Sequence, residues 1–155
     1  MKIEEGFTID APADDVWALL SDPQRVAALL PGAEIKEKID DTTYAGGIVI
    51  KVGPLVAAYS GTVSFLLNED DRSAVVHAKG QGKAGMGTAD MTMNSRVTPL
   101  ADGRTEVTLD SDVTVSGILA QLGRGMTQVV SKKMLQEFVA RLTTALASEA
   151  KEAEA

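Results

Sequence analysis

The residues whose types could support catalysis are few and far apart in this sequence. The chain has no cysteine and a single histidine, His77. His77 alternates with Val76 and Ala78, so it falls on the solvent-facing side of a predicted strand. General acid–base and nucleophilic catalysis need a base placed beside a reacting group. The strand parity supplies no inward pair of carboxylates and no nucleophile beside a base, which favours binding over catalysis.

Asp110 and Asp112 share one face of another predicted strand. Two neighbouring carboxylates attract cations, but hard cations in proteins usually take more oxygen ligands than two such groups provide. We interpret the pair as part of a solvated charged face and expect no metal site.

The glycine-rich stretch from Gly80 to Gly87 superficially resembles a phosphate-binding loop. Such a loop opens a helix, whose N-terminal amides hold the anion. Here the stretch leads into the alternating residues 88–97, which predict a strand. We therefore expect a hairpin tip, with Met86 as a candidate flap over a pocket.

The chain has 155 residues, enough for one domain with a sizeable core. Its net charge of −7 and isoelectric point near 4.7 disfavour binding to nucleic acid and tight docking on anionic lipid. The N-terminal residues do not resemble a signal peptide, and no apolar run is long enough to span a membrane. We expect a cytoplasmic protein, with reversible contact at the inner face of the cell membrane as an open alternative.

Alternation of apolar and polar residues predicts about seven strands. One strand covers residues 3–9, where Glu5 is the polar residue on an otherwise apolar parity. Two short helices follow, the first after Pro12 and the second from Pro23 to Leu29. Six more strands are predicted at residues 35–39, 44–52, 55–67, 73–82, 88–97 and 104–115. One apolar and one polar face per strand is typical of an antiparallel sheet, and short connections favour a meander.

The last part of the chain predicts one long helix. Every fourth residue is apolar, and together these residues form one stripe along the helix. They are Ile118, Leu122, Met126, Val130, Met134, Phe138, Leu142 and Leu146. The predicted fold class is therefore α+β, with a curved antiparallel sheet wrapped around a long C-terminal helix, in one domain over residues 1–147. Residues 148–155 predict a frayed polar tail.

The predicted strands carry small residues at the inward positions opposite this helix. They are Gly46, Ala57, Gly61, Ala78, Gly80 and Ala89. Small residues within strands indicate either close packing or unfilled space. An apolar pocket with few polar groups is typical of a small-molecule site, and Tyr59 would supply an orienting hydrogen bond there; the alternative is that the same residues form an ordinary core. The candidate ligand-binding residues are Trp17, Leu30, Ile48, Ile50, Tyr59, Val63, Val76, Ala78, Met86, Met91, Met93, Leu109, Leu119, Leu122, Met126 and Val130.

Three features are candidates for the mouth of this pocket, and each has a structural alternative. Trp17, on the first short helix, either borders the mouth or staples that helix to the core. The apolar loop at residues 29–32 either gates the pocket or packs as a helix end. Gly117, Gly123 and Gly125 either hinge the start of the long helix or allow close packing on the sheet.

The order of strand, two short helices, sheet and long helix resembles the START-like (SRPBCC) helix-grip superfamily. Four stretches within it resemble the family of the G subunit of carbon monoxide dehydrogenase: FTIDAPADDVWALLSDPQRVAALLPG, VGPLVAAYSGTV, GQGKAGMGTADMTM and SGILAQLGRGM. They cover most of residues 3–142. The opening motif is shared across the superfamily, so the combination of Val52-Gly53-Pro54 with Ala120-Gln121-Leu122-Gly123 is the more diagnostic.

The resemblance implies a non-catalytic accessory protein of a molybdenum hydroxylase such as carbon monoxide dehydrogenase. Family members are associated with recruiting the enzyme to the membrane and with binding a quinone, here menaquinone or ubiquinone, in the cavity. No covalently held cofactor is implied. Many relatives continue into a hydrophobic C-terminal anchor, whereas this chain ends at Ala155, so we expect reversible membrane contact. The alternatives are a cyclase- or hydrolase-type enzyme of the same superfamily and an assembly factor that binds no ligand.

Overall fold

The computed structural model describes residues 1–52, 54–121 and 123–154 of the chain. Seven strands, four α-helices and one short 3₁₀ turn, η1, follow one another in it. In chain order they are β1 (Lys2–Ile9), α1 (Ala13–Leu20), α2 (Pro23–Leu29), β2 (Ala33–Lys38), β3 (Thr43–Val52), β4 (Leu55–Asn68), β5 (Ser73–Gly82), η1 (Lys83–Gly85), β6 (Thr88–Pro99), β7 (Thr105–Val115), α3 (Ile118–Gln121) and α4 (Gly123–Glu154).

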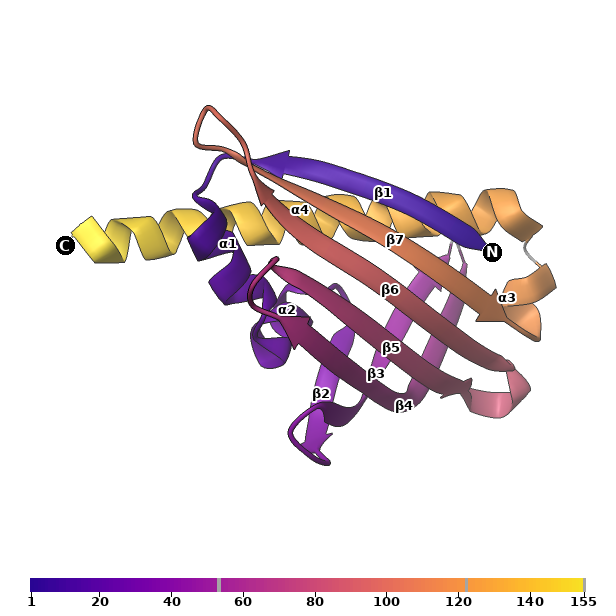
Figure 1. Cartoon of the computed structure of the whole chain (residues 1–155). Helices are drawn as coiled ribbons and strands as arrows, with labels where there is room; N and C mark the ends of the chain where they lie inside the picture. The colour runs from indigo at the N-terminus through magenta and orange to yellow at the C-terminus, as the bar shows by residue number, and fades with distance from the viewer. Residues whose placement is uncertain (53, 122, 155) are drawn as a thin grey trace.

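All seven strands belong to one antiparallel sheet with the order β1-β7-β6-β5-β4-β3-β2. The strands from β2 to β7 therefore form a meander, and the first strand closes onto the last. The sheet is strongly curved, α4 lies along one of its faces, and α1 and α2 sit at one end of that face (Figure 1). The predicted α+β fold is confirmed, and the predicted bounds of β5 and α2 match the structure.

The long C-terminal helix differs from the prediction of one uninterrupted helix from Ile118 to Leu146. The structure has two helices, α3 and α4, and the second begins at Gly123. Gly123 has a φ angle of +78°, a left-handed conformation that glycine adopts readily and that a regular right-handed helix does not contain. The prediction was therefore wrong at the start of the helix. At its other end, α4 continues to Glu154, through most of the predicted polar tail.

A row of small residues crosses four strands on the face that α4 covers. In register from β3 to β6, the row is Gly46, Gly61, Gly80 and Ala89. A Cβ atom on Gly46 would overlap the carbonyl oxygen of Glu34 in β2, and one on Gly61 would overlap that of Lys79 in β5. These two glycines thus let neighbouring backbones approach closely, as sharply bent sheets require. Close packing, one of the two alternatives for these small residues, occurs here between strands.

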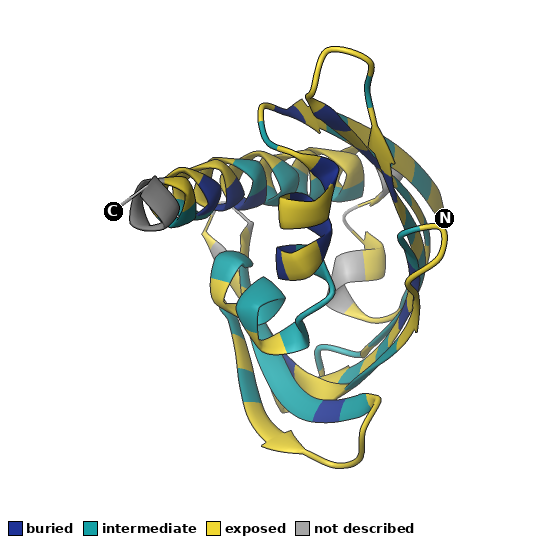
Figure 2. Cartoon of the chain, turned by 60° about the vertical axis from the view of Figure 1, so that its left-hand side comes forward, coloured by how far each residue is buried: buried dark blue, intermediate teal, exposed yellow. Residues whose placement is uncertain are grey.

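The hydrophobic core is concentrated where α1 lies between the sheet and the C-terminal half of α4. Figure 2 shows buried residues on α1 and on the part of α4 nearer the C-terminus. An ion pair between Arg25 of α2 and Glu149 of α4 also joins the helices here. We call this region the packed end, defined by Ile9, Ala13, Val16, Trp17, Leu19, Ala74, Val97, Val107, Phe138, Leu142 and Leu146.

Candidate ligand-binding site

Burial decreases steadily along α4 as the helix leaves the packed end. Leu142 is fully buried, Val130 is half-buried, and Met126 is 42% exposed, although all three belong to the same apolar stripe. The sheet shows the same trend, because Val97 of β6 is buried whereas Met91 on the same face is half-buried. Apolar side chains stay half-exposed on a covered face only where the covering helix does not close over them. The described residues therefore cover this second region less completely than the packed end.

We call the second region the open end. It comprises the half-buried inward residues of the sheet and of the first half of α4, together with the buried Tyr59. Five strands contribute to it, and most of the predicted ligand-binding residues lie there. They are Ile48, Ile50, Tyr59, Val63, Ala78, Met91, Met93 and Leu109 from the sheet, with Val130 and the more exposed Met126 from α4; Leu109 also packs against the packed end.

Other predicted residues lie elsewhere. Trp17 is 7% exposed within the packed end, and its indole N–H donates a hydrogen bond of 2.6 Å to Glu69 in the β4–β5 turn. Leu30 packs against the same core, and Val76 is buried on β5. These positions favour the alternative in which Trp17 staples α1 to the core and the loop after α2 packs as a helix end.

Two predicted ligand-binding residues cannot be placed. Leu122 and the side chain of Leu119 lie outside the described residues, as do Gly53 and the side chain of Val52 in the diagnostic motif.

Tyr59 is a buried polar residue in the otherwise apolar lining of the open end. It is 6% exposed, and its hydroxyl is buried without a hydrogen-bond partner among the residues that the structure describes. Burial raises the pKa of the Tyr59 phenol above its usual range, so the phenol remains a donor at neutral pH. A buried polar group without a partner costs about 1–3 kcal/mol. A ligand oxygen that accepts this hydrogen bond would remove the cost.

The hairpin tip between β5 and β6 lies beside Tyr59. Gly82 stands opposite Tyr59 in register, and a Cβ on Gly82 would lie 3.2 Å from Cε1 of the Tyr59 ring and 2.7 Å from the Cβ of Met86. The amide of Thr88 donates to Oγ of Ser116 at 2.9 Å, which joins the hairpin to the end of β7. The predicted hairpin is confirmed, and the role of Met86 as a flap remains a prediction.

An ionisable side chain interrupts the apolar inward parity of the first strand. Glu5 of β1 is half-buried, and Ser131 of α4 donates a hydrogen bond of 3.3 Å to its Oε1. Strand parity placed Glu5 inward, but the partner lies 126 residues further along the chain. The sequence pattern therefore predicts the inward position of Glu5, whereas the contact with Ser131 can be seen only in the folded structure.

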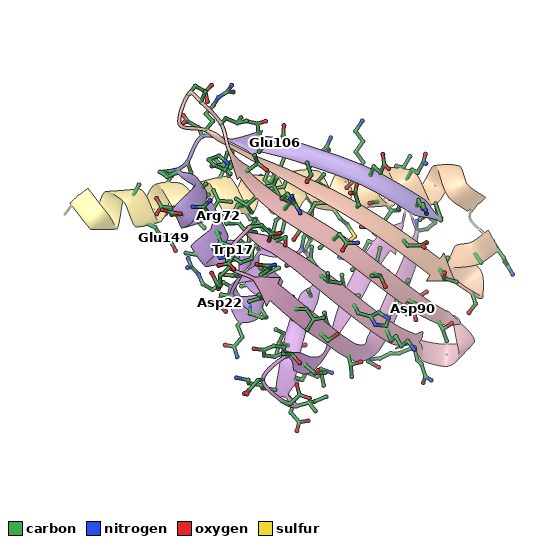
Figure 3. All side chains as sticks on the ribbon, in the orientation of Figure 1. Trp17, Asp22, Arg72, Asp90, Glu106 and Glu149 are labelled. Atoms are coloured by element: carbon green, nitrogen blue, oxygen red, sulfur yellow. The ribbon has the colours of Figure 1, made fainter. Side chains whose placement is uncertain are left out.

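The opposite face of the sheet is exposed to solvent, as predicted, and carries both polar side chains and the exposed apolar residues Val49, Val56, Leu66 and Val75. His77 is exposed there, with its Nε2 3.1 Å from Oδ1 of Asp90. Figure 3 shows Asp90 on β6, on the side of the sheet away from α4. The prediction that His77 faces solvent is confirmed.

Two hollows formed by the described residues lie outside the predicted lining. One, of about 360 Å³, lies between α2 and β2. The other, of about 510 Å³, lies where the start of α4 faces the ends of β1 and β7.

Among residues 1–52, 54–121 and 123–154, no helix combines the length and hydropathy that crossing a membrane requires.

Comparison with solved structures identifies the fold. A conserved protein from Geobacillus kaustophilus superposes with a TM-score of 0.86 at 19% identity, covering 96% of each chain. The Zhui aromatase/cyclase of a Streptomyces species gives 0.67 at 19% identity, covering 95% of this chain and 93% of its own. A START superfamily protein from Mycobacterium smegmatis gives 0.65 at 13% identity, covering 95% and 97%. The chain therefore has the START-like fold, which it shares with an aromatase/cyclase.

Comparison of the sequence with protein families is more specific. Curated proteins gave no significant match. Residues 6–147 match the family described as CoxG, the G subunit of carbon monoxide dehydrogenase, over nearly the whole length of the chain. The curved sheet, the two short helices and the divided C-terminal helix all lie within or overlap the matched range. This chain belongs to the CoxG family, named for the G subunit of carbon monoxide dehydrogenase.

Proposed function

We propose that this chain is a non-catalytic accessory protein that binds an isoprenoid quinone at the open end, between the sheet and α4. The observation that carries the proposal is the half-buried apolar lining, contributed by five strands and by the first half of α4. Burying each methylene group of a ligand contributes about 0.8 kcal/mol. A few isoprene units against this lining would therefore be held tightly by desolvation alone.

Tyr59 supports a ligand with a carbonyl group. Its phenol is buried and lacks a partner among the described residues, and its raised pKa keeps it protonated. A quinone carbonyl accepts hydrogen bonds and donates none, so it complements this donor. The headgroup would lie near Tyr59, and the apolar tail would contact the methionines of β6.

Family membership supports the partner. The family is described by its association with carbon monoxide dehydrogenase. In our proposal, the chain recruits a molybdenum hydroxylase of this kind to the membrane or exchanges quinone with it. Contact with the membrane would be reversible, at its cytoplasmic face.

The first experiment is native mass spectrometry of protein purified from a lysate that contains membranes, followed by organic extraction of bound lipid. Ala78→Trp fills the inward face of β5, whereas Lys79→Trp adds the same bulk on the exposed face one residue away. We expect stoichiometric quinone in the wild type and in Lys79→Trp, and an empty, folded Ala78→Trp variant.

Two results would contradict the proposal. Retention of quinone by a folded Ala78→Trp variant would mean that the ligand lies elsewhere. A wild-type protein that is empty and also fails to take up added quinone would favour an assembly factor without a ligand.

A further inference from the structure

Glu5 places a carboxylate on the apolar inward face of the sheet. Its neighbours of the same parity on β1 are Ile3 and Phe7, both half-buried and apolar. Removing a carboxylate from water is unfavourable unless hydrogen bonds replace the hydration. A carboxylate offers about four acceptor positions, and the described residues supply Glu5 with one bond, of 3.3 Å, from Ser131. The remaining acceptor positions of the half-buried Glu5 are therefore open to water or to a bound molecule.

The sheet places further small polar groups beside Glu5. Leu109 of β7 stands opposite Glu5, and Ser95 of β6 stands opposite Leu109. Ser111 follows Leu109 on the same inward parity of β7 and is half-buried. Glu5 and Ser111 on the sheet and Ser131 on α4 thus form one polar patch, which we call the Glu5 patch, on a surface that is otherwise apolar.

A groove leads from the surface of the molecule toward the Glu5 patch. Its volume, about 510 Å³, lies within the range of small-molecule sites. It is lined by Met1, Lys2, Val113, Thr114, Val115, Ala120, Gly123 and Thr127, and so lies next to the Glu5 patch without containing any of its residues. Thr127 and Ser131 are four residues apart and so share one face of α4, and Val113 and Ser111 share the inward face of β7. The groove and the patch are therefore consecutive along the seam between α4 and the β1–β7 edge.

Glu5 and Tyr59 offer opposite chemistry at separate positions. The phenol of Tyr59 donates to a carbonyl, whereas the carboxylate of Glu5 accepts from a hydroxyl. β7, β6 and β5 lie between their two strands. At about 4.8 Å per strand, this is roughly 19 Å along the curved sheet, so the two groups occupy separate positions on it.

We infer that the Glu5 patch is a second ligand subsite, reached through this groove, that binds the hydroxyl group of a quinol. The inference rests on the proposed function and adds to it that the two redox forms of the ligand occupy different polar positions. Tyr59 holds the oxidised form through its carbonyl, and Glu5 and Ser131 hold the reduced form through its hydroxyl.

The test is calorimetric titration, without oxygen, of decylubiquinone and of its borohydride-reduced quinol into wild-type protein and variants. Glu5→Leu removes the acceptor, and Glu4→Leu is the matched control on the exposed face of the same strand. We expect Glu5→Leu to weaken binding of the quinol about tenfold, as the loss of a hydrogen bond to a charged group does, and to leave the quinone affinity within about twofold. Glu4→Leu changes neither affinity.

The outcomes separate the inference from the proposed function. If wild-type protein binds both forms and Glu5→Leu affects them equally or not at all, the Glu5 patch is not a quinol subsite. If wild-type protein binds neither form, the proposed function fails and the inference fails with it. Circular dichroism melting of Glu5→Leu confirms that any loss of binding occurs in folded protein.

The groove has its own test. Thr127→Trp should block it and slow association of the quinol in stopped-flow mixing by about tenfold, whereas Thr143→Trp, exposed on the same helix, should not. An unchanged association rate in Thr127→Trp would overturn the groove as the route to the patch.

Discussion

The packed end and the open end are both built from the sheet and α4, but the packed end also contains α1. Side chains of α1, among them the fully buried Val16, fill the space between the two layers there. At the open end the apolar lining of the sheet and of α4 stays half-buried. The two ends therefore differ in how completely the described side chains fill the space between the sheet and α4. A third layer of side chains provides stability at one end, and the described residues place no such layer at the other, where we propose that the ligand binds.

The two ends should differ most in how they respond to truncation of the same helix stripe. Leu142→Ala, at the packed end, should lower the free energy of unfolding by about 3 kcal/mol, because it creates a cavity in a filled core. Met126→Ala, 42% exposed at the open end, should change it by less than about 0.5 kcal/mol. Urea denaturation of both variants measures the difference. Equal losses would show that α4 packs uniformly and that the two ends are not distinct.

The glycine row provides a second comparison. Gly61→Ala should cost about 2 kcal/mol, because its Cβ would overlap the carbonyl of Lys79 and push β4 and β5 apart. Gly80→Ala meets only ordinary contacts, the nearest being the Cβ of Tyr59 at 3.4 Å, so it should be neutral or slightly stabilising. Thermal melting distinguishes the two. Equal tolerance of both substitutions would mean that the bend does not depend on Gly61.

Trp17 tests whether the packed end takes part in binding. Trp17→Phe keeps an aromatic ring but loses the hydrogen bond to Glu69, so stability should fall by about 1 kcal/mol. Quinone affinity, measured by titration, should stay unchanged, because Trp17 lies in the filled core. A loss of affinity in the folded variant would extend the ligand site into the packed end.

Tyr59 should affect stability about as much as Trp17, but with the opposite sign and a distinctive pH dependence. Burial raises its pKa, so above about pH 10 the unfolded chain loses the phenolic proton while the folded chain retains it. The ionisation of Tyr59 therefore leaves stability unchanged below about pH 10 and lowers it as the pH rises toward the folded pKa. Tyr59→Phe should remove this part of the decline and, near pH 7, stabilise the empty protein by about 1 kcal/mol, because it removes a buried group without a partner among the described residues. Urea titrations between about pH 8 and pH 11 check both effects, and identical profiles in the two proteins would contradict them.

Local patterns predicted the strands well, because a strand's two faces can be read from alternation alone. The bounds of β5 and the inward parity of Tyr59, Met91 and Glu5 follow from period-two alternation. The apolar periodicity of the last helix was misleading, since it continues across residue 122 and hides the break at Gly123. The glycine itself was the available signal.

Contacts between distant segments could not be read from such patterns. The bond from Trp17 to Glu69 spans 52 residues and decides that Trp17 belongs to the core rather than to a mouth. The bond from Ser131 to Glu5 spans 126 residues. The sequence pattern also does not predict how burial varies along α4. Met126 and Leu142 occupy equivalent positions in the apolar stripe and differ only in what the fold places opposite them.

The row of Gly46, Gly61, Gly80 and Ala89 has a consequence for engineering. Because Gly46 and Gly61 in this row allow the close backbone approach that the bend requires, the width of the proposed site is set by the scaffold more than by the side chains that line it. Lining residues such as Met91 and Met93 can then be exchanged for larger or more polar ones without flattening the sheet. A library that varies the lining and keeps the glycines would therefore change the shape of the accepted ligand while the scaffold stays constant.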